Sequence, residues 1–361
     1  MRVTLKDIAQ RAGVSMMTVS NVINGNSARV SQATIERIER IVVELGYVPS
    51  HSARSLAAKS SRMVGVLVPA ADEESLTISP HNVAIIGQLE RELRKRAYDV
   101  LLRGIARPGE VAEALRAWNL DGAVLLGFLD EEIATFTAAS TGRTKIVAVD
   151  SYADNPVTRG VRTDDFTGGR LAAEHLKGLG HVDVVFAGPR FAGHGVVWQR
   201  FQGFREELGA DCAVEAVNTT YDAGVDLGRR LRAEHPSATA VFATADILAI
   251  GIQAGLQEAG VRVPDEVSVM GFDDLDLCRY VRPTLTTIAQ DLPEKAATAV
   301  AMLIGEIERD EAPPESATLD VRLVERGSTG PVGGAAAGET AGVVAGGGPA
   351  GTAGVGAVGA D

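Results

Sequence analysis

The sequence has few of the features that mark secreted or membrane-spanning proteins. Among its 361 residues only Cys212 and Cys278 are cysteines, and they lie far apart with no metal-ligand spacing. This excludes a disulfide framework and argues against a zinc site. The opening stretch MRVTLKD lacks the apolar run of a signal peptide, and no uninterrupted apolar segment reaches ~18 residues. We therefore expect a cytoplasmic protein without a membrane span.

Catalytic signatures are also missing, and aromatic residues make up only 4% of the chain. The sequence contains no G-x-S-x-G, P-loop or H-E-x-x-H pattern. Its many acidic residues fall mostly on predicted helices, where a solvated face is the ordinary explanation. The sequence therefore favours a protein that is not an enzyme, and it predicts no cofactor and no metal.

Charge is distributed unevenly along the chain. The first 62 residues contain nine Lys or Arg and four Asp or Glu, a balance of +5. The net charge of the whole chain is −12, so the other 299 residues carry a net charge of −17. A basic first segment joined to an acidic body indicates a nucleic-acid contact confined to one end of the protein. Chance clustering of basic residues is the alternative.

Three short helices are predicted within the first 46 residues. Each begins after a hydroxyl residue that can cap it and ends at a glycine, and apolar residues recur every three or four positions. The capping residues are Thr4, Ser15 and Ser31, and the final glycines are Gly13, Gly25 and Gly46. The tight turn between the first two helices is typical of a helix-turn-helix unit.

The second of these helices, residues 16–23, has an unusual outer face. Its valines and Ile23 form an inner face, which leaves Met16, Met17 and Asn21 pointing outward. In a major groove, Asn reads adenine and Met contacts thymine methyl groups. Short polar side chains suited to phosphates surround them, namely Ser15, Thr18, Ser20 and Asn24. A plain three-helix bundle is the alternative, but two exposed methionines fit it poorly.

Residues 49–62 form a short helix-prone segment between Pro49 and a polar stretch. Alone it is too short to be a stable helix in water. Folding on DNA would make Leu56 an apolar wedge for the minor groove. A simple interdomain linker is the alternative interpretation.

From residue 63 onward, short apolar runs alternate with helical stretches in two successive sets. This alternation predicts parallel sheets with helices on both faces. Strands are expected over 64–69, 99–104, 121–127 and 145–150, and then over 182–188, 213–218, 238–244 and 267–274, with one helix among others over 130–139. The predicted fold class is an α/β core of two doubly wound parallel-sheet subdomains behind an all-α head. Ligands bind such sheets at the carboxyl ends of the strands, which here means the cleft between subdomains.

The chain ends in a stretch rich in glycine and alanine with almost no charge, for which we expect disorder. The predicted organisation is a DNA-binding head (1–48), a hinge helix and linker (49–62), a two-lobed effector-binding and dimerisation core (63–328) and this tail (329–361).

The first part of the chain resembles the DNA-binding head and hinge of the LacI/GalR family of transcription repressors. The resemblance is carried by TLKDIAQRAGVSMMTVSNVIN, RVSQATIERIERIVVELGYVPSHSARSLAAK and MVGVLVP. It implies that Leu56 pries open the central base step of the operator, with Ala53 packed beside it. The positions that would contact the DNA backbone are Thr4, Ser15, Thr18, Ser20, Asn24, Ser31, Thr34 and Tyr47. Met16, Met17 and Asn21 would read bases, and because many members have Arg in place of Asn21, a different operator core is expected.

Residues 63–328 resemble, more loosely, the effector-binding core of the same family, which is akin to periplasmic sugar-binding proteins. The matching stretches include LAAEHLKGLGHVDVVFAGP, VFATADILAIGI and VSVMGFDD. The resemblance implies three chain crossings, with an N-subdomain of 63–160 and 290–318 and a C-subdomain of 161–289 and 319–328. It implies effector contacts from Asp150, Arg200, Tyr221, Asp273 and Gln290. An Arg fork and a carboxylate suit vicinal hydroxyls or an anionic group, although a surface ion pair and a turn cap are the alternatives for Arg200 and Asp273.

Two departures from the family bear on the ligand. Ala245 replaces the usual Asn before Asp246, and the loop AADEESLTISPHN after the first strand lacks the aromatic residues that stack on sugars. His81 and His194 lie in loops expected near the cleft, where a solvated histidine is the ordinary interpretation.

Together these observations predict a dimeric transcription regulator, most simply a repressor, that binds a palindromic operator and is controlled by a sugar or sugar derivative. Effector and DNA would then affect each other's affinity reciprocally. An activator, or a repressor with a nucleobase corepressor, remains open within this class. The alternative from another class is a cytoplasmic small-molecule binding protein or enzyme whose head is a docking module.

Overall fold

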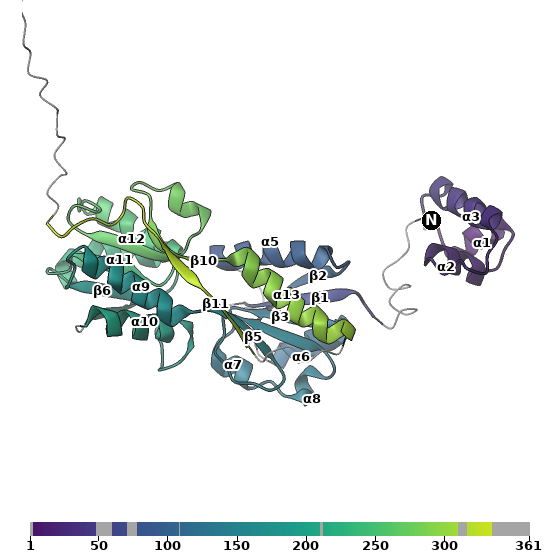
Figure 1. Ribbon diagram of the computed structural model, residues 1–361, viewed down its shortest axis with the longest axis horizontal. Coiled ribbons are helices and arrows are strands. Elements are labelled where there is room, and N and C mark those ends of the chain that lie inside the picture. The colour runs from purple at the N-terminus through teal and green to yellow at the C-terminus, as the bar shows by residue number, and fades with distance from the viewer. Residues whose placement is uncertain are drawn as a thin grey trace, which may run out of the picture.

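The computed structural model describes residues 3–47, 60–70, 78–107, 109–209, 212–309 and 316–333. These residues form a small helical head and two α/β lobes, as Figure 1 shows. We call the lobe built on the sheet that contains β1 lobe 1, and the lobe built on the sheet that contains β6 lobe 2.

The head consists of α1 (Leu5–Ala12), α2 (Met16–Ile23) and α3 (Gln32–Glu44). Thr4 and Asp7 form the predicted capping box, in which each side chain accepts a hydrogen bond from the other's backbone N–H. One residue from each helix is completely buried in the small core: Ile8, Val19 and Ile38. The structure thus confirms the predicted three-helix unit.

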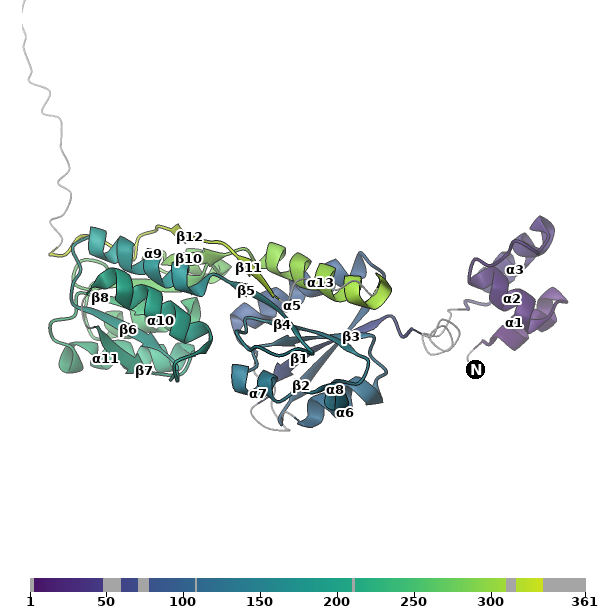
Figure 2. The ribbon, with the colours of Figure 1, turned by 60° about the horizontal axis from the view of Figure 1, so that its bottom comes forward.

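Lobe 1 contains a six-stranded, wholly parallel sheet in the order β11-β5-β4-β3-β1-β2. Its strands are β1 (Met63–Pro69), β2 (Asp99–Ile105), β3 (Gly122–Leu126), β4 (Lys145–Val149), β5 (Arg159–Thr163) and β11 (Ser316–Leu319). Val66 points to a core shared with α5 (Pro80–Arg94) and α13 (Leu292–Arg309). The next residue, Leu67, points to the opposite core under α6 (Gly109–Ala117) and α7 (Asp130–Ala134). Both faces are therefore covered, as Figure 2 also shows.

Lobe 2 repeats this design with the order β12-β10-β9-β8-β6-β7. Its strands are β6 (Val184–Gly188), β7 (Ala213–Ala216), β8 (Ala240–Ala243), β9 (Ser268–Asp273), β10 (Thr286–Gln290) and β12 (Val321–Val324). Phe186 packs under α9 (Asp165–Gly178) and α10 (Gly195–Leu208), while its neighbour Val185 packs under α11 (Tyr221–Glu234) and α12 (Asp246–Glu258). The short 3₁₀ helix η1 (Asp276–Arg279) follows β9.

The chain passes between the lobes three times, each time at the carboxyl end of a strand. β5 of lobe 1 leads into α9, β10 of lobe 2 leads into α13, and β11 leads into β12. The first passage therefore follows Thr163, because β5 extends slightly beyond the expected boundary at 160. All three passages lie where the carboxyl ends of the two sheets face each other.

Three details differ from the sequence expectations. The helix expected over 130–139 is divided into α7 and α8 (Ala138–Thr141), since Thr137 is extended and caps a new helix. β12 runs antiparallel to β10, so the second sheet is not wholly parallel. Residues 329–333 belong to the ordered core rather than the predicted tail, because Val332 N donates to the Leu179 carbonyl at 3.1 Å.

The rest of the predicted tail, from residue 334, lies outside the described residues, as do Ala53 and Leu56. Across the described segments, none of the helices combines the length and apolarity that a bilayer crossing requires.

Candidate functional site

The outer face of α2 exposes the side chains that the sequence assigned to base reading. Met16 and Met17 are 54% and 71% exposed, whereas Asn21 is partly buried. Burial of Val19 and Val22 in the head core fixes this orientation. An exposed apolar pair at the start of a short helix is suited to a partner surface that carries methyl groups.

The hydroxyl residues predicted to contact a DNA backbone gather at the first turns of the helices. Ser15 Oγ lies 2.9 Å from Thr18 Oγ1 at the start of α2, and Ser31 Oγ lies 2.9 Å from Thr34 Oγ1 at the start of α3. At the start of α1, Thr4 Oγ1 instead accepts from the Asp7 amide at 3.4 Å. Helix starts present free N–H groups and a positive dipole end, so these positions are suited to phosphates.

The remaining predicted contacts of the head are placed less uniformly. Asn24 Nδ2 donates to Ser20 Oγ at 3.2 Å at the end of α2. Tyr47 is partly buried against the head core.

A cavity of about 500 Å³ lies between the two lobes. Lobe 1 lines it with residues that follow β1, β3 and β4, and lobe 2 lines it with residues that follow β6, β8 and β9. Its position agrees with the rule that ligands bind at the carboxyl ends of parallel strands. Its volume falls within the range of roughly 300–1,000 Å³ that is typical of small-molecule sites.

Asp150 projects from the end of β4 into the floor of this cavity. Its backbone has φ +58°, an uncommon conformation for a residue with a side chain. Lys295 of α13, fully buried, donates to Asp150 Oδ1. Burial alone would raise the pKa of Asp150, but the charges of Lys295 and His81 outweigh it and hold the pKa well below its usual range.

His81, in the first turn of α5, lies between two carboxylates from different lobes. Its Nε2 is 3.0 Å from Asp150 Oδ2, and its Nδ1 is 3.2 Å from Asp273 Oδ1. Burial opposes protonation of the ring, but the two carboxylates dominate and raise the pKa of His81 to about 9. Because both nitrogens face acceptors, the ring is an imidazolium near neutral pH.

Asp273 ends β9 with φ +126°, so both cavity-floor carboxylates have a strained backbone. Gln290, at the end of β10, donates from Nε2 to Asp273 Oδ1 at 2.6 Å, and its Oε1 accepts from Lys295 and Thr163. Gln290 therefore connects Asp273 of lobe 2 with Lys295 of lobe 1.

Asp246 is a further buried carboxyl, at the start of α12. It accepts hydrogen bonds from the Thr287 hydroxyl at 2.6 Å and from the Leu275 amide at 2.8 Å. Burial, followed by the charge of Asp273, raises the pKa of Asp246 to about 7. It does not line the cavity, although its neighbour Ala245 does.

Arg200 of α10 reaches the cavity from lobe 2 and is held on three sides. Its Nε donates to Asp165 at 2.8 Å, and its guanidinium lies 3.5 Å from the ring centre of Phe272. A third contact runs to the Thr244 carbonyl. The side chain is buried, so it is not the surface ion-pair residue that was the alternative from sequence.

The close approach of α9 and α10 brings Arg200 to Asp165. A Cβ at Gly169 of α9 would lie 1.9 Å from the Arg200 carbonyl oxygen, so no larger residue fits there. Asp165 also accepts from the Tyr152 hydroxyl of lobe 1 at 3.0 Å, which adds a contact between lobes.

The five predicted effector residues are thus placed differently. Asp150, Arg200 and Asp273 line the cavity together. Gln290 lies behind them, and Tyr221 does not line the cavity but is 42% exposed at the start of α11.

Sequence reasoning missed Lys295 and undervalued His81. In KAATAVAMLIGEI, Lys295 occupies a position of the apolar stripe with Ala299 and Met302, which is a signal of a buried charge. His81 gave no comparable signal. Its two partners are distant in sequence.

The cavity mouth is bridged by a second histidine. His194, the N-cap residue of α10, has its Nε2 2.8 Å from Glu131 Oε1 of α7, so this pair also joins the lobes. Hydrogen bonding to Glu131 raises the pKa of His194. Aromatic surface, absent from the loop after β1, is supplied instead by Phe128 and Phe191.

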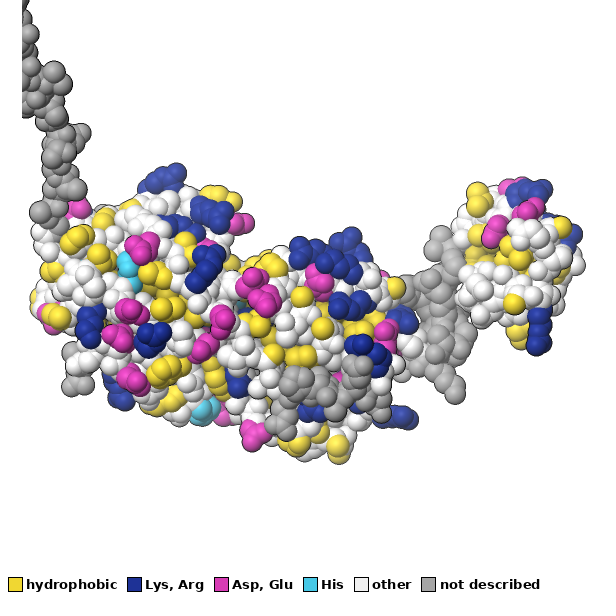
Figure 3. All heavy atoms as spheres, viewed as in Figure 1, with side chains coloured by type: hydrophobic (Ala, Val, Ile, Leu, Met, Phe, Trp, Pro, Cys, Tyr) yellow, Lys and Arg dark blue, Asp and Glu magenta, His cyan; other side chains and the backbone are white. Residues whose placement is uncertain are grey.

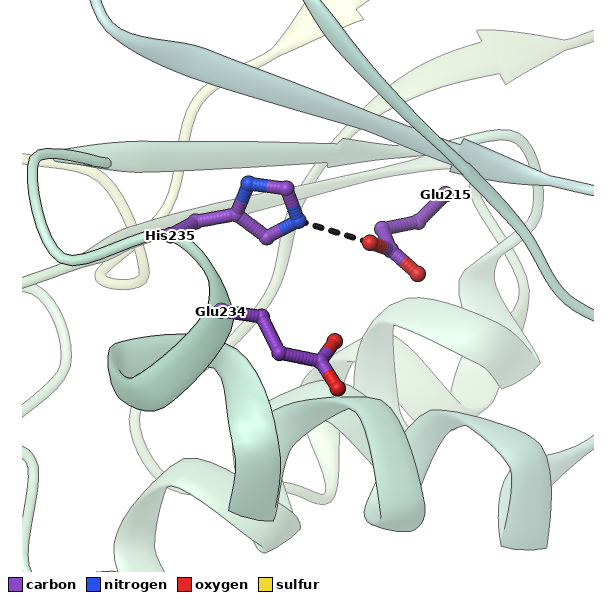
Figure 4. Close-up of side chains that lie close together, drawn as sticks. All are labelled: Glu215, Glu234 and His235. Atoms are coloured by element: carbon purple, nitrogen blue, oxygen red, sulfur yellow. Dashed lines mark hydrogen bonds and ion pairs between the residues drawn. The ribbon is translucent and has the colours of Figure 1, made fainter.

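One cluster elsewhere has the composition of a metal site. Figure 4 shows Glu215 of β7 close to Glu234 and His235 at the end of α11. His235 Nε2 lies 2.6 Å from Glu215, and Arg230 pairs with both carboxylates. Because Arg230 already neutralises these groups, the cluster is an ion-pair network between β7 and α11.

Basic side chains gather on lobe 1 near the end of α5, as the dark blue region there in Figure 3 shows. The basic residues of that helix end are Arg91, Arg94, Lys95 and Arg96, around the acidic Glu92. Lobe 1 therefore has its own cationic region despite the acidic total charge of the protein.

Two family profiles match the chain. The one described as bacterial regulatory proteins, lacI family, matches residues 4–50, and the periplasmic binding protein-like domain matches residues 173–329. The transcriptional regulator CelR of Thermobifida fusca is 31% identical over 349 residues, which cover 91% of this chain and 98% of CelR. The transcriptional repressor PurR of Mannheimia succiniciproducens is 30% identical over 336 residues, covering 90% and 98%.

Solved structures agree with these matches. The lac repressor dimer bound to operator and the anti-inducer ONPF superposes with a TM-score of 0.81 at 26% identity, covering 91% of this chain and all of the other. A CelR–cellobiose complex has a TM-score of 0.67 at 27% identity with the same coverage. A ribose-bound regulator from Enterococcus faecium has a TM-score of 0.65 at 29% identity, covering 75% and 99%.

Proposed function

This chain belongs to the LacI family of bacterial transcriptional regulators, and we propose that it is a dimeric repressor of an imperfectly palindromic operator, controlled by a sugar or sugar derivative. Its general activity is that of the family. It is a DNA-binding regulator with an effector domain of the periplasmic-binding-protein type, and not an enzyme. One observation carries the proposal. A helix-turn-helix head is joined to a two-lobed core, and the cavity between the lobes combines carboxylates that can accept from hydroxyl groups with a buried Arg.

In the proposed complex, α2 enters the major groove with Met16, Met17 and Asn21 facing base edges. The exposure of the two methionines and the orientation set by Val19 support this arrangement. The hydroxyls at the helix starts and Asn24, Ser20 and Tyr47 would contact phosphates, which position the helix without reading sequence.

A dimer would present two such helices to successive major grooves, as the two-fold symmetry of a palindrome requires. The lac repressor was solved as a dimer on its operator, which supports the same assembly here. Leu56 and Ala53 remain predicted hinge contacts in the central minor groove. A repressor acts on chromosomal DNA, so a cytoplasmic location is part of the proposal.

The effector would bind in the cavity between the lobes. Asp150 and Asp273 would accept hydrogen bonds from its hydroxyls, and Arg200 would donate to its oxygens. Gln290 would act from behind, by holding Asp273 and Lys295 in place. Tyr221 remains a predicted contact near the cavity-lining Thr219. Structures of similar proteins with cellobiose and ribose support the sugar class.

A gel-shift experiment with two-fold-symmetric duplexes from DNA upstream of the protein's own coding region tests the proposal. We expect the protein to bind one such duplex in preference to random competitor DNA. This preference should change when a sugar that binds the protein is added. Leu56→Ala should weaken specific binding while it leaves salt-dependent non-specific binding nearly intact. Absence of any sequence preference would refute the repressor function, and equal loss of both binding modes would refute the wedge.

A further inference from the structure

We propose that His81 determines which effectors the cavity accepts, because its imidazolium balances the charge of the cavity floor and restricts the ligand to an uncharged polyol. This inference rests on the proposed effector function of the cavity. It assigns a purpose to a side chain that neither binds DNA nor belongs to the predicted effector residues.

His81 belongs to lobe 1, and its two nitrogens face Asp150 of lobe 1 at 3.0 Å and Asp273 of lobe 2 at 3.2 Å. The His81 side chain is only 16% exposed, so water screens these two electrostatic contacts weakly. Both carboxylates line the cavity together with the ring. A ligand that reaches the floor therefore meets the three groups as one unit.

The charged groups at the cavity floor form three pairs of opposite charge. Lys295 pairs with Asp150, and Arg200 pairs with Asp165. Asp273 has His81 as its cation, together with the uncharged amide of Gln290. Three acidic groups thus face three basic ones. Removing His81 would leave the floor with one uncompensated negative charge, located at Asp273.

The other ionisable groups around the ring do not upset this balance in mildly acidic solution. Asp246 lies behind Asp273, and its pKa of about 7 keeps it largely protonated in mildly acidic solution. The neighbours of His81 on α5 that line the cavity, Ser79 and Asn82, are uncharged. Asp130, Glu131, Arg190 and His194 also line the cavity. Asp130 accepts hydrogen bonds from the Ser151 hydroxyl at 2.6 Å and from the Tyr152 amide at 2.9 Å, and Glu131 pairs with His194. These residues are two acids and two bases, so they add no net charge while His194 is protonated.

The chemical consequence follows from the cost of buried charge. Sugar hydroxyls donate to the carboxylates and accept from Arg200 without adding charge. An ammonium or carboxylate on the ligand would have no free counter-charge at the balanced floor, and burying it there is costly. A floor without His81 would instead favour a ligand with one positive charge.

The experiment measures binding of full-length protein to a matched panel by calorimetry at about pH 6, well below the pKa of about 7 of Asp246, so that this carboxyl is mostly protonated. The uncharged probes are ribose, glucose and cellobiose, glucosamine is the cationic probe, and gluconate and glucose 6-phosphate are the anionic probes. We expect the wild type to bind an uncharged probe in preference to every charged one. In His81→Gln, affinity for that probe should fall by about tenfold, the effect of one charge-assisted hydrogen bond to a carboxylate that His81 no longer holds in place. Affinity for glucosamine should rise relative to affinity for the uncharged probe.

His235→Gln is the matched control. It removes a histidine–carboxylate pair of the same kind, His235 with Glu215 at 2.6 Å, and neither residue lines the cavity. Selectivity among the probes should therefore stay as in the wild type. A change equal to that of His81→Gln would overturn the inference, because a general loss of structure rather than floor charge would explain the data.

A pH series on the wild type gives a test that needs no variant to fold. Raising the pH from about 8, where Asp246 is already ionised, through 9 removes the imidazolium of His81. Sugar affinity should therefore fall over this range in the wild type and in His194→Gln, which lacks the other imidazole of the cavity. Tyr152 and Cys278 do not titrate there, because burial raises the pKa of each above this range. Affinity that does not change with pH would contradict the inference.

The outcomes separate the inference from the proposed function. Preferential binding of glucosamine, gluconate or glucose 6-phosphate by the wild type overturns the inference while operator binding still supports a regulator. Failure of every probe to bind also overturns it. Loss of operator preference in the gel shift would refute the proposed function itself.

Discussion

The floor and the mouth of the cavity contain the same kind of contact in different surroundings. At the floor, His81 joins the lobes through two carboxylates and is 16% exposed, whereas at the mouth His194 and Glu131 are 47% and 61% exposed. Water and salt screen the exposed pair, but they reach the buried group poorly. A histidine–carboxylate pair should therefore have a large effect on ligand binding and stability at the floor and a small effect at the mouth.

The largest effect is expected for Lys295→Met, which removes the buried partner of Asp150. The uncompensated carboxylate should lower the free energy of unfolding by about 3–5 kcal/mol. Urea unfolding at neutral pH measures this change. Arg94→Met, in an exposed pair with Glu90, is the control and should leave the unfolding midpoint nearly unchanged. Similar midpoints for both variants would show that the floor charges are not interdependent.

The second prediction concerns the pH dependence of stability. The folded-state pKa of His81 is about 9, above its ordinary value of 6.5, so protonation favours the folded protein. Its contribution is complete below about pH 6.5 and is lost as the pH rises through 9, a difference of about 3 kcal/mol. The difference in unfolding free energy between wild type and His81→Gln should shrink over this window. A difference that stays constant with pH would argue against an imidazolium at the floor.

The smallest effect is expected at the mouth. Glu131→Gln should not change the unfolding midpoint measurably, because both members of the pair are exposed. Any effect on sugar dissociation should disappear as salt concentration increases. Thermal unfolding and stopped-flow dissociation, compared at low and high salt, check this. A salt-resistant loss of stability would remove the distinction between mouth and floor.

Local signals accounted for most of the elements. Thr4, Ser15 and Ser31 mark three helix starts, and each is the observed N-cap. Buried apolar runs mark the strands, because parallel strands covered on both faces need apolar residues throughout. The division of the 130–139 helix and the antiparallel β12 were missed, since the first depends on one extended Thr137 and the second on a late passage between lobes.

The candidate site was predictable only in part. Asp150 and Asp273 follow strand-like runs, so their place at a sheet edge could be inferred, and the family resemblance added Arg200. Their charge partners could not be inferred from local pattern. Lys295 lies 145 positions from Asp150, and His81 is between two residues that belong to different lobes.

The sequence by itself determined the helix caps, the alternation of strands and helices, the basic head and the family. These features depend on the periodicity of apolar residues and on neighbours within a few positions, and both can be read from a short stretch of the sequence. Only the tertiary structure decided which charges meet at the cavity floor, and that His81 rather than solvent lies between two carboxylates. Those pairings arise where three chain passages bring strand ends together, and the balance of a buried charge depends on all the groups around it at once.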